Sequence, residues 1–154
     1  MHTSESAWPG HAPLVIKLGG MAVDDPAQAE GLLRAVVELH AREPGGVVLV
    51  HGGGKAVDRR MERLGLPTVR AAGLRVTPPD QIDEVVATLA GVVNSRLTAA
   101  LAHLGARAVG LRIGDGGLAT AAAMVRPGVD LGHVGEVTGG DPAMLHRLLS
   151  EGYL

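Results

Sequence analysis

Two short apolar runs, each ending in a glycine-rich turn, constrain the fold more than any other feature of the sequence. Leu14–Leu18 leads into Gly19-Gly20, and Val47–Val50 leads into His51-Gly52-Gly53-Gly54. Short apolar runs suit buried strands, and glycines at their ends suit tight exits. A helical pattern follows each turn, and the order strand, helix, strand, helix predicts an α/β fold with a mainly parallel sheet.

The rest of the chain continues this alternation. Helical spacing follows Asp25-Pro26, recurs over residues 54–64, and is longest over 80–104. Residues 107–111 resemble a third buried strand, residues 118–125 and 133–137 resemble strands of a hairpin or a meander, and Asp141-Pro142 opens a final helix. Tyr153-Leu154 resembles the first step of a further strand. We expect one domain over residues 14–154, preceded by a flexible segment over residues 1–13.

Composition excludes several classes of function. The formal charge is −2 with both signs dispersed, so no nucleic-acid or membrane-surface footprint is present. The absence of cysteine excludes disulfides and thiolate metal sites. No apolar run is expected to approach the roughly 18 residues of a membrane span. The first dozen residues lack the apolar centre of a signal peptide. These features predict a cytoplasmic protein.

The chain contains only two lysines, Lys17 and Lys55, against twelve arginines. Lysine is a compact point charge on a thin stem, whereas arginine is a wide planar fork, so the two are not equivalent in a tight site. Lys17 lies inside an apolar run, where an unpaired ammonium is costly to bury. It therefore either serves a site or reaches into solvent from the strand end.

Both glycine-rich turns are predicted to leave the C-terminal ends of parallel strands, the edge at which α/β sheets bind ligands. Glycine lets backbone N–H groups approach an anion, and a helix N-terminus adds partial positive charge. With Lys17 beside them, the turns suit a phosphoryl group in transfer, which needs positioning and charge stabilisation. The alternative is that each turn is purely structural.

Other glycine-rich motifs fit less well. An esterase oxyanion hole requires a Gly-x-Ser-x-Gly elbow, and no serine lies in one. A P-loop requires Ser or Thr after its lysine, but Ala56 follows Lys55. The dinucleotide fingerprint Gly-x-Gly-x-x-Gly is also absent. The pattern therefore favours phosphoryl transfer outside these classes.

Three motifs resemble those of the amino acid kinase family: Ile16–Gly20, His51–Gly54 and Gly73–Thr77. The third motif, with the helix after Asp80 and the segment Leu131–Gly135, is similar to the branch that phosphorylates N-acetyl-L-glutamate. The resemblance implies an open three-layer αβα sandwich. It also implies transfer of the ATP γ-phosphate to the side-chain carboxylate of N-acetylglutamate, a step of arginine biosynthesis.

The resemblance also implies roles for individual residues. Lys17 would stabilise the transferring phosphoryl group. Backbone amides would bind phosphate at Gly19, Gly20 and Gly52. ATP would arrive as its Mg²⁺ complex, and no protein-bound metal is expected.

On the acceptor side, the resemblance implies that Gly53 and Gly54 hold N-acetylglutamate and that Arg75 pairs with its α-carboxylate. The segment 73–77 would then act as a lid. Lys55 receives no role beyond a solvated position in its helix. Asp115 is expected to form a turn, and His51 to orient its own loop.

Family members continue with a second sub-domain that holds most of the nucleotide. The chain is therefore expected to carry the acceptor half, to stop before the nucleotide-binding sub-domain, and to have little activity alone. By resemblance it would form a homodimer through the 80–104 helix. The thirteen residues before Leu14 are too few for the helix that makes relatives sensitive to arginine. Two alternatives remain: a kinase of aminoadipate type, and a non-catalytic module that binds acetylamino acids or a partner chain.

Overall fold

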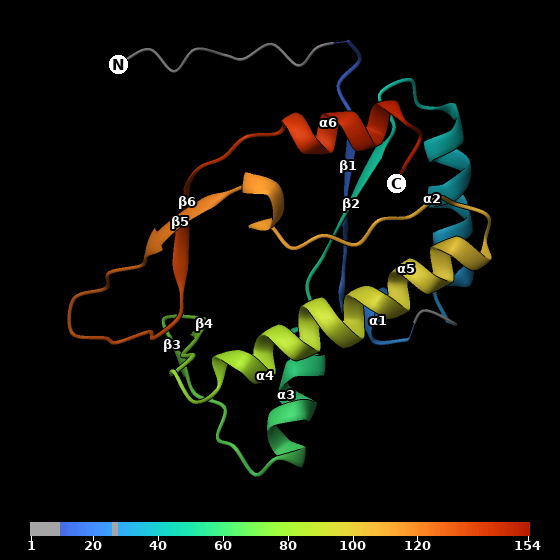
Figure 1. Ribbon diagram of the computed structural model, residues 1–154. Coiled ribbons are helices and arrows are strands. Elements are labelled where there is room, and N and C mark those ends of the chain that lie inside the picture. The colour runs from blue at the N-terminus through green and yellow to red at the C-terminus, as the bar shows by residue number, and fades with distance from the viewer. Residues whose placement is uncertain (1–9, 26–27) are drawn as a thin grey trace.

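The computed structural model describes residues 10–25 and 28–154 (Figure 1). Its elements, with η1 a π-helical and η2 a 3₁₀ segment, run in the order β1 (Leu14–Leu18), α1 (Gly20–Asp24), α2 (Glu30–Arg42), β2 (Val47–His51), α3 (Gly54–Arg63), β3 (Arg70–Ala71), β4 (Leu74–Arg75), α4 (Ile82–Val86), η1 (Ala87–Val93), α5 (Asn94–His103), η2 (Asp115–Gly117), β5 (Thr120–Ala123), β6 (Gly135–Gly139) and α6 (Ala143–Ser150). Residues 1–9 of the predicted flexible segment 1–13, and Pro26 of the predicted helix start, lie outside the described residues.

The two apolar runs form the parallel pair that the sequence predicts. β1 and β2 align from Leu14 opposite Val47 to Leu18 opposite His51. Because the last residues of both strands are paired, the two glycine-rich turns leave the pair at the same level. The α/β character and the parallel sheet are therefore confirmed.

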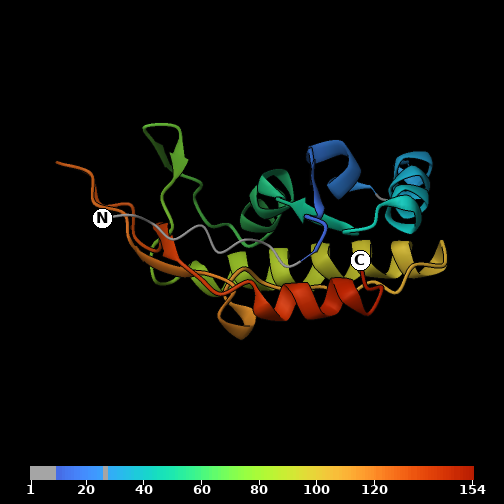
Figure 2. The same cartoon turned by 90° about the horizontal axis from the view of Figure 1, so that it is seen from above.

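One long helix, made of α4, η1 and α5, forms the base of the core. Its apolar stripe is buried at Val93, Leu97 and Leu101, none of which is more than 4% exposed. The stripe belongs to one cluster of buried residues: Leu18, Val23, Ala29, Leu33, Val93, Leu97 and Leu101. Figure 2 shows α1, α2 and α3 on one side of this helix and α6 on the other. The ends of β1 and the first two helices thus rest on the long helix.

The same helix, Ile82–His103, is long and apolar enough to cross a membrane by length and composition. The expectation that no segment reaches this length was therefore wrong. Periodic small and apolar residues raise the mean hydropathy of a helix whose inner face packs in a protein core. Here that inner face is the stripe of the core cluster.

Two antiparallel hairpins complete the described strands. β3 and β4 pair Arg70 with Arg75 across a turn in which Ala72 and Gly73 both have positive φ, 49° and 80°. This is the geometry of a type I′ turn, which suits the twist of short hairpins. β5 and β6 form the second hairpin and confirm the one expected within residues 118–137.

The third buried strand expected over residues 107–111 does not form. This stretch has one pairing contact, in which the Leu154 N–H donates to the Arg107 carbonyl at 3.0 Å and the Val109 N–H donates to the Leu154 carbonyl at 2.9 Å. A ladder needs a neighbour along its whole length, and one residue supplies a single pair. The two bonds agree with the expectation that Tyr153-Leu154 begins a strand.

Candidate active site

The two glycine-rich turns and the helices after them share one edge of the β1–β2 pair. Leu18 and His51 are opposite each other in the strand pair, and Gly19 and Gly52 follow them directly. α1 begins at Gly20 and α3 at Gly54. The N–H groups of the first turn of a helix have no partners within the helix, so donors gather at this edge.

A cavity of about 380 Å³ lies between these turns. It is lined by Lys17, Leu18, Gly19, Gly20, Val23, Gly52, Gly53, Gly54, Lys55, Asp58 and Arg70. The structure therefore brings together every site residue expected from the sequence except Arg75. It adds three polar residues for which the sequence suggested no role at the site: Lys55, Asp58 and Arg70.

Both lysines of the chain line this one cavity. Lys17 is exposed on β1, and Lys55 is exposed as the second residue of α3. The exposure of Lys17 removes the cost of burying an unpaired ammonium in the strand. The sequence did hold one sign that Lys55 belongs to the site: it is one of only two lysines in a chain with twelve arginines, and Lys17 is the other.

The glycines of the turns differ in what surrounds them. A Cβ added at Gly19, Gly52 or Gly54 would meet no atom within 4 Å, so space remains open above these residues. A Cβ at Gly53 would lie 2.7 Å from Cδ2 of Leu89 in η1. Gly53 is thus where the second turn packs on the long helix, while the others leave room for a ligand.

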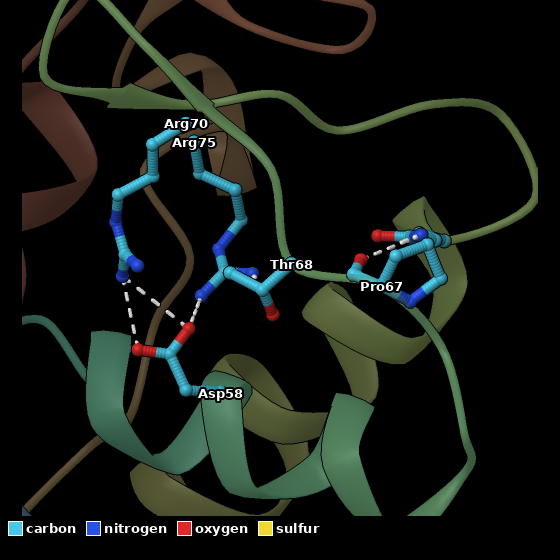
Figure 3. Close-up of polar contacts among 6 residues, drawn as sticks. Asp58, Pro67, Thr68, Arg70 and Arg75 are labelled. Atoms are coloured by element: carbon cyan, nitrogen blue, oxygen red, sulfur yellow. Dashed lines mark hydrogen bonds and ion pairs between the residues drawn. The ribbon is translucent and has the colours of Figure 1, made fainter.

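Asp58 joins α3 to the β3–β4 hairpin through two arginines (Figure 3). Nη2 of Arg70 donates to both carboxylate oxygens of Asp58, at 2.9 and 3.3 Å, and Nη2 of Arg75 donates to Oδ1. Burial alone would raise the pKa of the Asp58 carboxyl. The hydrogen bonds and charges of Arg70 and Arg75 outweigh this effect and hold that pKa below its usual value.

Arg75 contacts Asp58, which lines the cavity, but Arg75 does not line the cavity itself. Its side chain is 15% exposed, and its Nη1 donates to Oγ1 of Thr68 at 3.3 Å. Arg75 therefore reaches the cavity through Asp58. Helical spacing could have suggested Asp58, since it lies four residues after Gly54 and shares that face of α3.

Two motifs far apart in the sequence meet beside this hairpin. The Thr77 N–H donates to the Leu131 carbonyl at 3.0 Å, and the His133 N–H donates to the Thr77 carbonyl at 2.7 Å. Thr77 and Leu131 are both buried. Gly132 has φ +63°, and a Cβ there would overlap the Thr77 carbonyl oxygen. The segment 131–133 therefore anchors the C-terminal end of the hairpin.

The remaining polar residues singled out in the sequence have local partners. Asp115 accepts the Arg112 N–H at 2.8 Å and pairs with its guanidinium, as expected for a turn. Nδ1 of His51 lies 2.9 Å from the carbonyl oxygen of Gly52, within its own loop. Within residues 10–25 and 28–154, no three His, Cys, Asp or Glu side chains gather as a metal site would require.

Parallel strands that end in two glycine-rich turns, with both lysines lining the cavity between the turns, define an α/β protein with positive charge and backbone donors at one edge. The model of the amino acid kinase family matches residues 12–154. The chain belongs to this family.

The most similar relatives include two named acetylglutamate kinases. The chain is 48% identical over 142 residues to that of Actinobacillus succinogenes and 47% identical over 146 residues to that of Edwardsiella ictaluri. Each match covers 92% of this chain and 54% of the relative. The chain thus spans about half the length of the curated relatives it matches.

Solved structures support the fold. The smu.665 protein of Streptococcus mutans superposes with a TM-score of 0.74 at 26% identity, over 91% of this chain and 55% of that protein. An N-acetylglutamate synthase of Neisseria gonorrhoeae, solved with coenzyme A and N-acetylglutamate, gives a TM-score of 0.72 at 27% identity. That match covers 93% of this chain and 32% of the synthase.

Proposed function

We propose that this chain forms the acceptor side of a kinase that transfers the ATP γ-phosphate to the side-chain carboxylate of N-acetyl-L-glutamate, in arginine biosynthesis. The observation that carries the proposal is that both lysines and both glycine-rich turns line one cavity. The names of the relatives supply the acceptor. The site supplies the charge and the donors that such a transfer needs.

The chemistry requires no base. The side-chain carboxylate is ionised at neutral pH, so one of its oxygens can attack the γ-phosphorus directly. The bond from that phosphorus to the β–γ bridging oxygen breaks, and ADP leaves with the electron pair. Negative charge develops on the equatorial oxygens, where Lys17 and the amides of Gly19, Gly20 and Gly52 would stabilise it. Mg²⁺ would arrive with ATP.

The acceptor would occupy the second turn, with Gly53 and Gly54 at its acyl part and Arg75 at its α-carboxylate. A guanidinium binds a carboxylate in a bidentate fork, which Asp58 now partly fills. The α-carboxylate would replace Asp58 on Arg75, while Arg70 keeps its bonds to Asp58. Exchange of Asp58 for the α-carboxylate on Arg75 would remove one of the two arginine contacts between the β3–β4 hairpin and α3, so the hairpin could shift toward the acceptor while Arg70 still holds Asp58.

Further properties of the whole kinase belong to the same proposal. They are a completed three-layer sandwich, a nucleotide site outside the matched half, a cytoplasmic location, and a homodimer. Exposed apolar residues on the long helix support the dimer, with Val86 42% and Val92 47% exposed. This chain alone is expected to transfer little phosphate, because transfer requires both substrates held together.

Calorimetry with N-acetylglutamate tests the acceptor site on the purified chain. Gly54→Ala should weaken binding at least tenfold, because its methyl group enters space that only a ligand would fill. Gly31→Ala is the matched control, since it also lies in a helix with no atom within 4 Å of its Cβ but is remote from the cavity. Equal affinities for the two variants would contradict the proposal.

A second function, binding without transfer, is favoured by the likeness to a synthase solved with N-acetylglutamate. The two functions differ in their need for nucleotide. The affinity of a binding module for N-acetylglutamate would not change when MgATP is added. The acceptor side of a kinase should bind N-acetylglutamate more tightly with MgATP present, because Lys17 and the glycine amides of the same cavity would hold the phosphoryl group. Calorimetry with N-acetylglutamate and with 2-aminoadipate derivatives, compared as acceptors, separates the kinase types.

A further inference from the structure

Lys55 lines the small cavity between the glycine-rich turns, and the proposed function gives it no role. It is the second residue of α3 and follows Gly54 directly, on the turn assigned to the acceptor. Its side chain is exposed and has no hydrogen bond or ion pair within the described residues 10–25 and 28–154. The amine of Lys55 is therefore not occupied by another group of the chain.

The proposed reaction leaves a reactive product in the same cavity. Transfer of a phosphoryl group to a carboxylate gives an acyl phosphate, a mixed anhydride whose acyl carbon is open to attack by an amine. In its unprotonated form, the amine of a lysine side chain is a nucleophile that attacks such carbonyl carbons. Confinement of amine and acyl phosphate in one cavity raises the rate of this step, because the two groups no longer have to meet by diffusion.

The two lysines of the cavity would meet different parts of this product. Lys17 holds the phosphate in the proposed function, so its ammonium is paired with phosphate oxygens and is not available as a nucleophile. Lys55 stands on the other turn, beside Gly53 and Gly54, where the acyl part would lie. A Cβ added at Gly54 would meet no atom within 4 Å, so the space next to Lys55 is open to an acyl group.

We propose that Lys55 is a self-modification site, acylated at Nζ by an acyl phosphate bound between the two glycine-rich turns. The source of that acyl phosphate rests on the proposed function. The lone pair of Nζ attacks the acyl carbon and forms an amide bond, while the bond from that carbon to the phosphate oxygen breaks. Inorganic phosphate leaves with the electron pair and takes up the proton that the nitrogen loses, so no further reactant is consumed.

Acylation of Lys55 changes both the charge and the free space of the cavity. Among the residues that line it, Lys17, Lys55 and Arg70 are cationic and Asp58 is anionic. An amide is neutral, so the excess of positive charge falls and an anion is held less strongly. The acyl group also fills part of the space beside Gly54. Product that the reaction consuming it does not remove therefore inactivates the site that made it.

Acetyl phosphate is the probe, because it carries the acyl phosphate group without the amino-acid part. The purified chain is incubated with it and cleaved after arginine, which separates the two lysines at Arg34 and Arg42. Mass spectrometry then follows acetylation of each lysine. We expect Lys55 to be acetylated about tenfold faster than Lys17, because the bound phosphate places the acyl carbon beside it. The rate at Lys55 should saturate with acetyl phosphate and fall when inorganic phosphate is added.

Gly52→Ala and Gly31→Ala are the matched variants. Neither glycine has a positive φ, and a Cβ at either position would meet no atom within 4 Å, so both variants keep the fold. The methyl group at Gly52 enters the cavity, whereas Gly31 is remote from it. Gly52→Ala should slow acetylation of Lys55 to the rate found for Lys17, and Gly31→Ala should leave it unchanged.

Four results would overturn the proposal, because each would mean that Lys55 reacts as an ordinary surface lysine or not at all. They are equal rates at Lys17 and Lys55, a rate at Lys55 that rises linearly with acetyl phosphate or ignores inorganic phosphate, equal behaviour of the two glycine variants, and no acetylation of Lys55. The assay contains neither N-acetylglutamate nor ATP. Its failure is therefore distinguishable from a failure of the proposed function, which calorimetry with N-acetylglutamate tests.

Discussion

Replacing Asp58 with asparagine tests whether this carboxylate holds the β3–β4 hairpin against α3. Asparagine keeps the size of the side chain and one acceptor oxygen but removes the charge. Arg75, only 15% exposed, would lose its ionic partner, and Arg70 would lose one of two acceptors. The variant should therefore unfold more easily and hold the hairpin less firmly.

The exposure of each ion pair sets how much free energy of unfolding Asp58→Asn should lose. The Arg70–Asp58 pair is exposed, with side chains 51% and 35% accessible, and is worth about 0.2–1 kcal/mol. The hydrogen bond from the largely buried Arg75 to a charged acceptor is worth about 1.5–3 kcal/mol. Because asparagine retains an acceptor and Asp58 is partly solvated, we expect Asp58→Asn to lower the free energy of unfolding by about 2 kcal/mol in total.

Urea unfolding at several pH values measures this loss. The lowered pKa of Asp58 means that its contribution is present above the unfolded pKa near 3.9 and is lost as pH falls through the lower folded value. The difference in free energy of unfolding between the native chain and Asp58→Asn should have its largest value at pH 7 and should shrink as pH falls below about 4.

Glu62→Gln is the matched control, because Glu62 is an exposed carboxylate on the same helix and has no ion pair within the described part of the chain. It should change stability by less than about 0.5 kcal/mol. Asp58 does not hold the hairpin in this way if Asp58→Asn lowers the free energy of unfolding no more than Glu62→Gln does, or if its effect is undiminished at pH 3.

Three further substitutions test the fold. Gly132→Ala should destabilise the chain by about 2–4 kcal/mol in thermal or urea unfolding, because the methyl group overlaps the Thr77 carbonyl and the backbone has φ +63°. Ala72→Asn should stabilise it by about 0.5–1 kcal/mol, because asparagine tolerates the φ of 49° better than alanine; a loss would contradict the turn geometry. Leu33→Ala should cost about 2–5 kcal/mol, because Leu33 is fully buried in the core cluster, and a smaller cost would mean that the core is looser than described.

Local patterns in the sequence were sufficient for much of the architecture. Alternation of apolar runs, glycine turns and helical stripes predicted β1, β2, α3 and the long helix, since each pattern depends on neighbours close in the sequence. Five glycines and Lys17 were predicted to share one edge of the sheet, and all six residues line the cavity there. Parallel pairing made this possible, because it brings the ends of separate strands together.

Contacts between distant residues could not be predicted in this way. The partnership of Asp58 with Arg70 and Arg75 depends on where the hairpin packs, and the sequence gives no spacing rule for it. Lys55 is exposed in α3, as the sequence predicted, but only the packing of α3 showed that it lines the same cavity as Lys17. Such contacts are set by packing over the whole chain.

The apolar runs and glycine turns by themselves determined that this chain forms a parallel α/β unit with both glycine-rich turns at one edge. Only the tertiary structure decided that Arg75 reaches that edge through Asp58 and that residues 107–111 remain irregular. A strand propensity becomes a strand when a neighbour supplies hydrogen bonds along its length, and at 107–111 the described chain supplies one residue, Leu154. Local sequence sets what a segment can form, and its neighbours in space decide whether it does so.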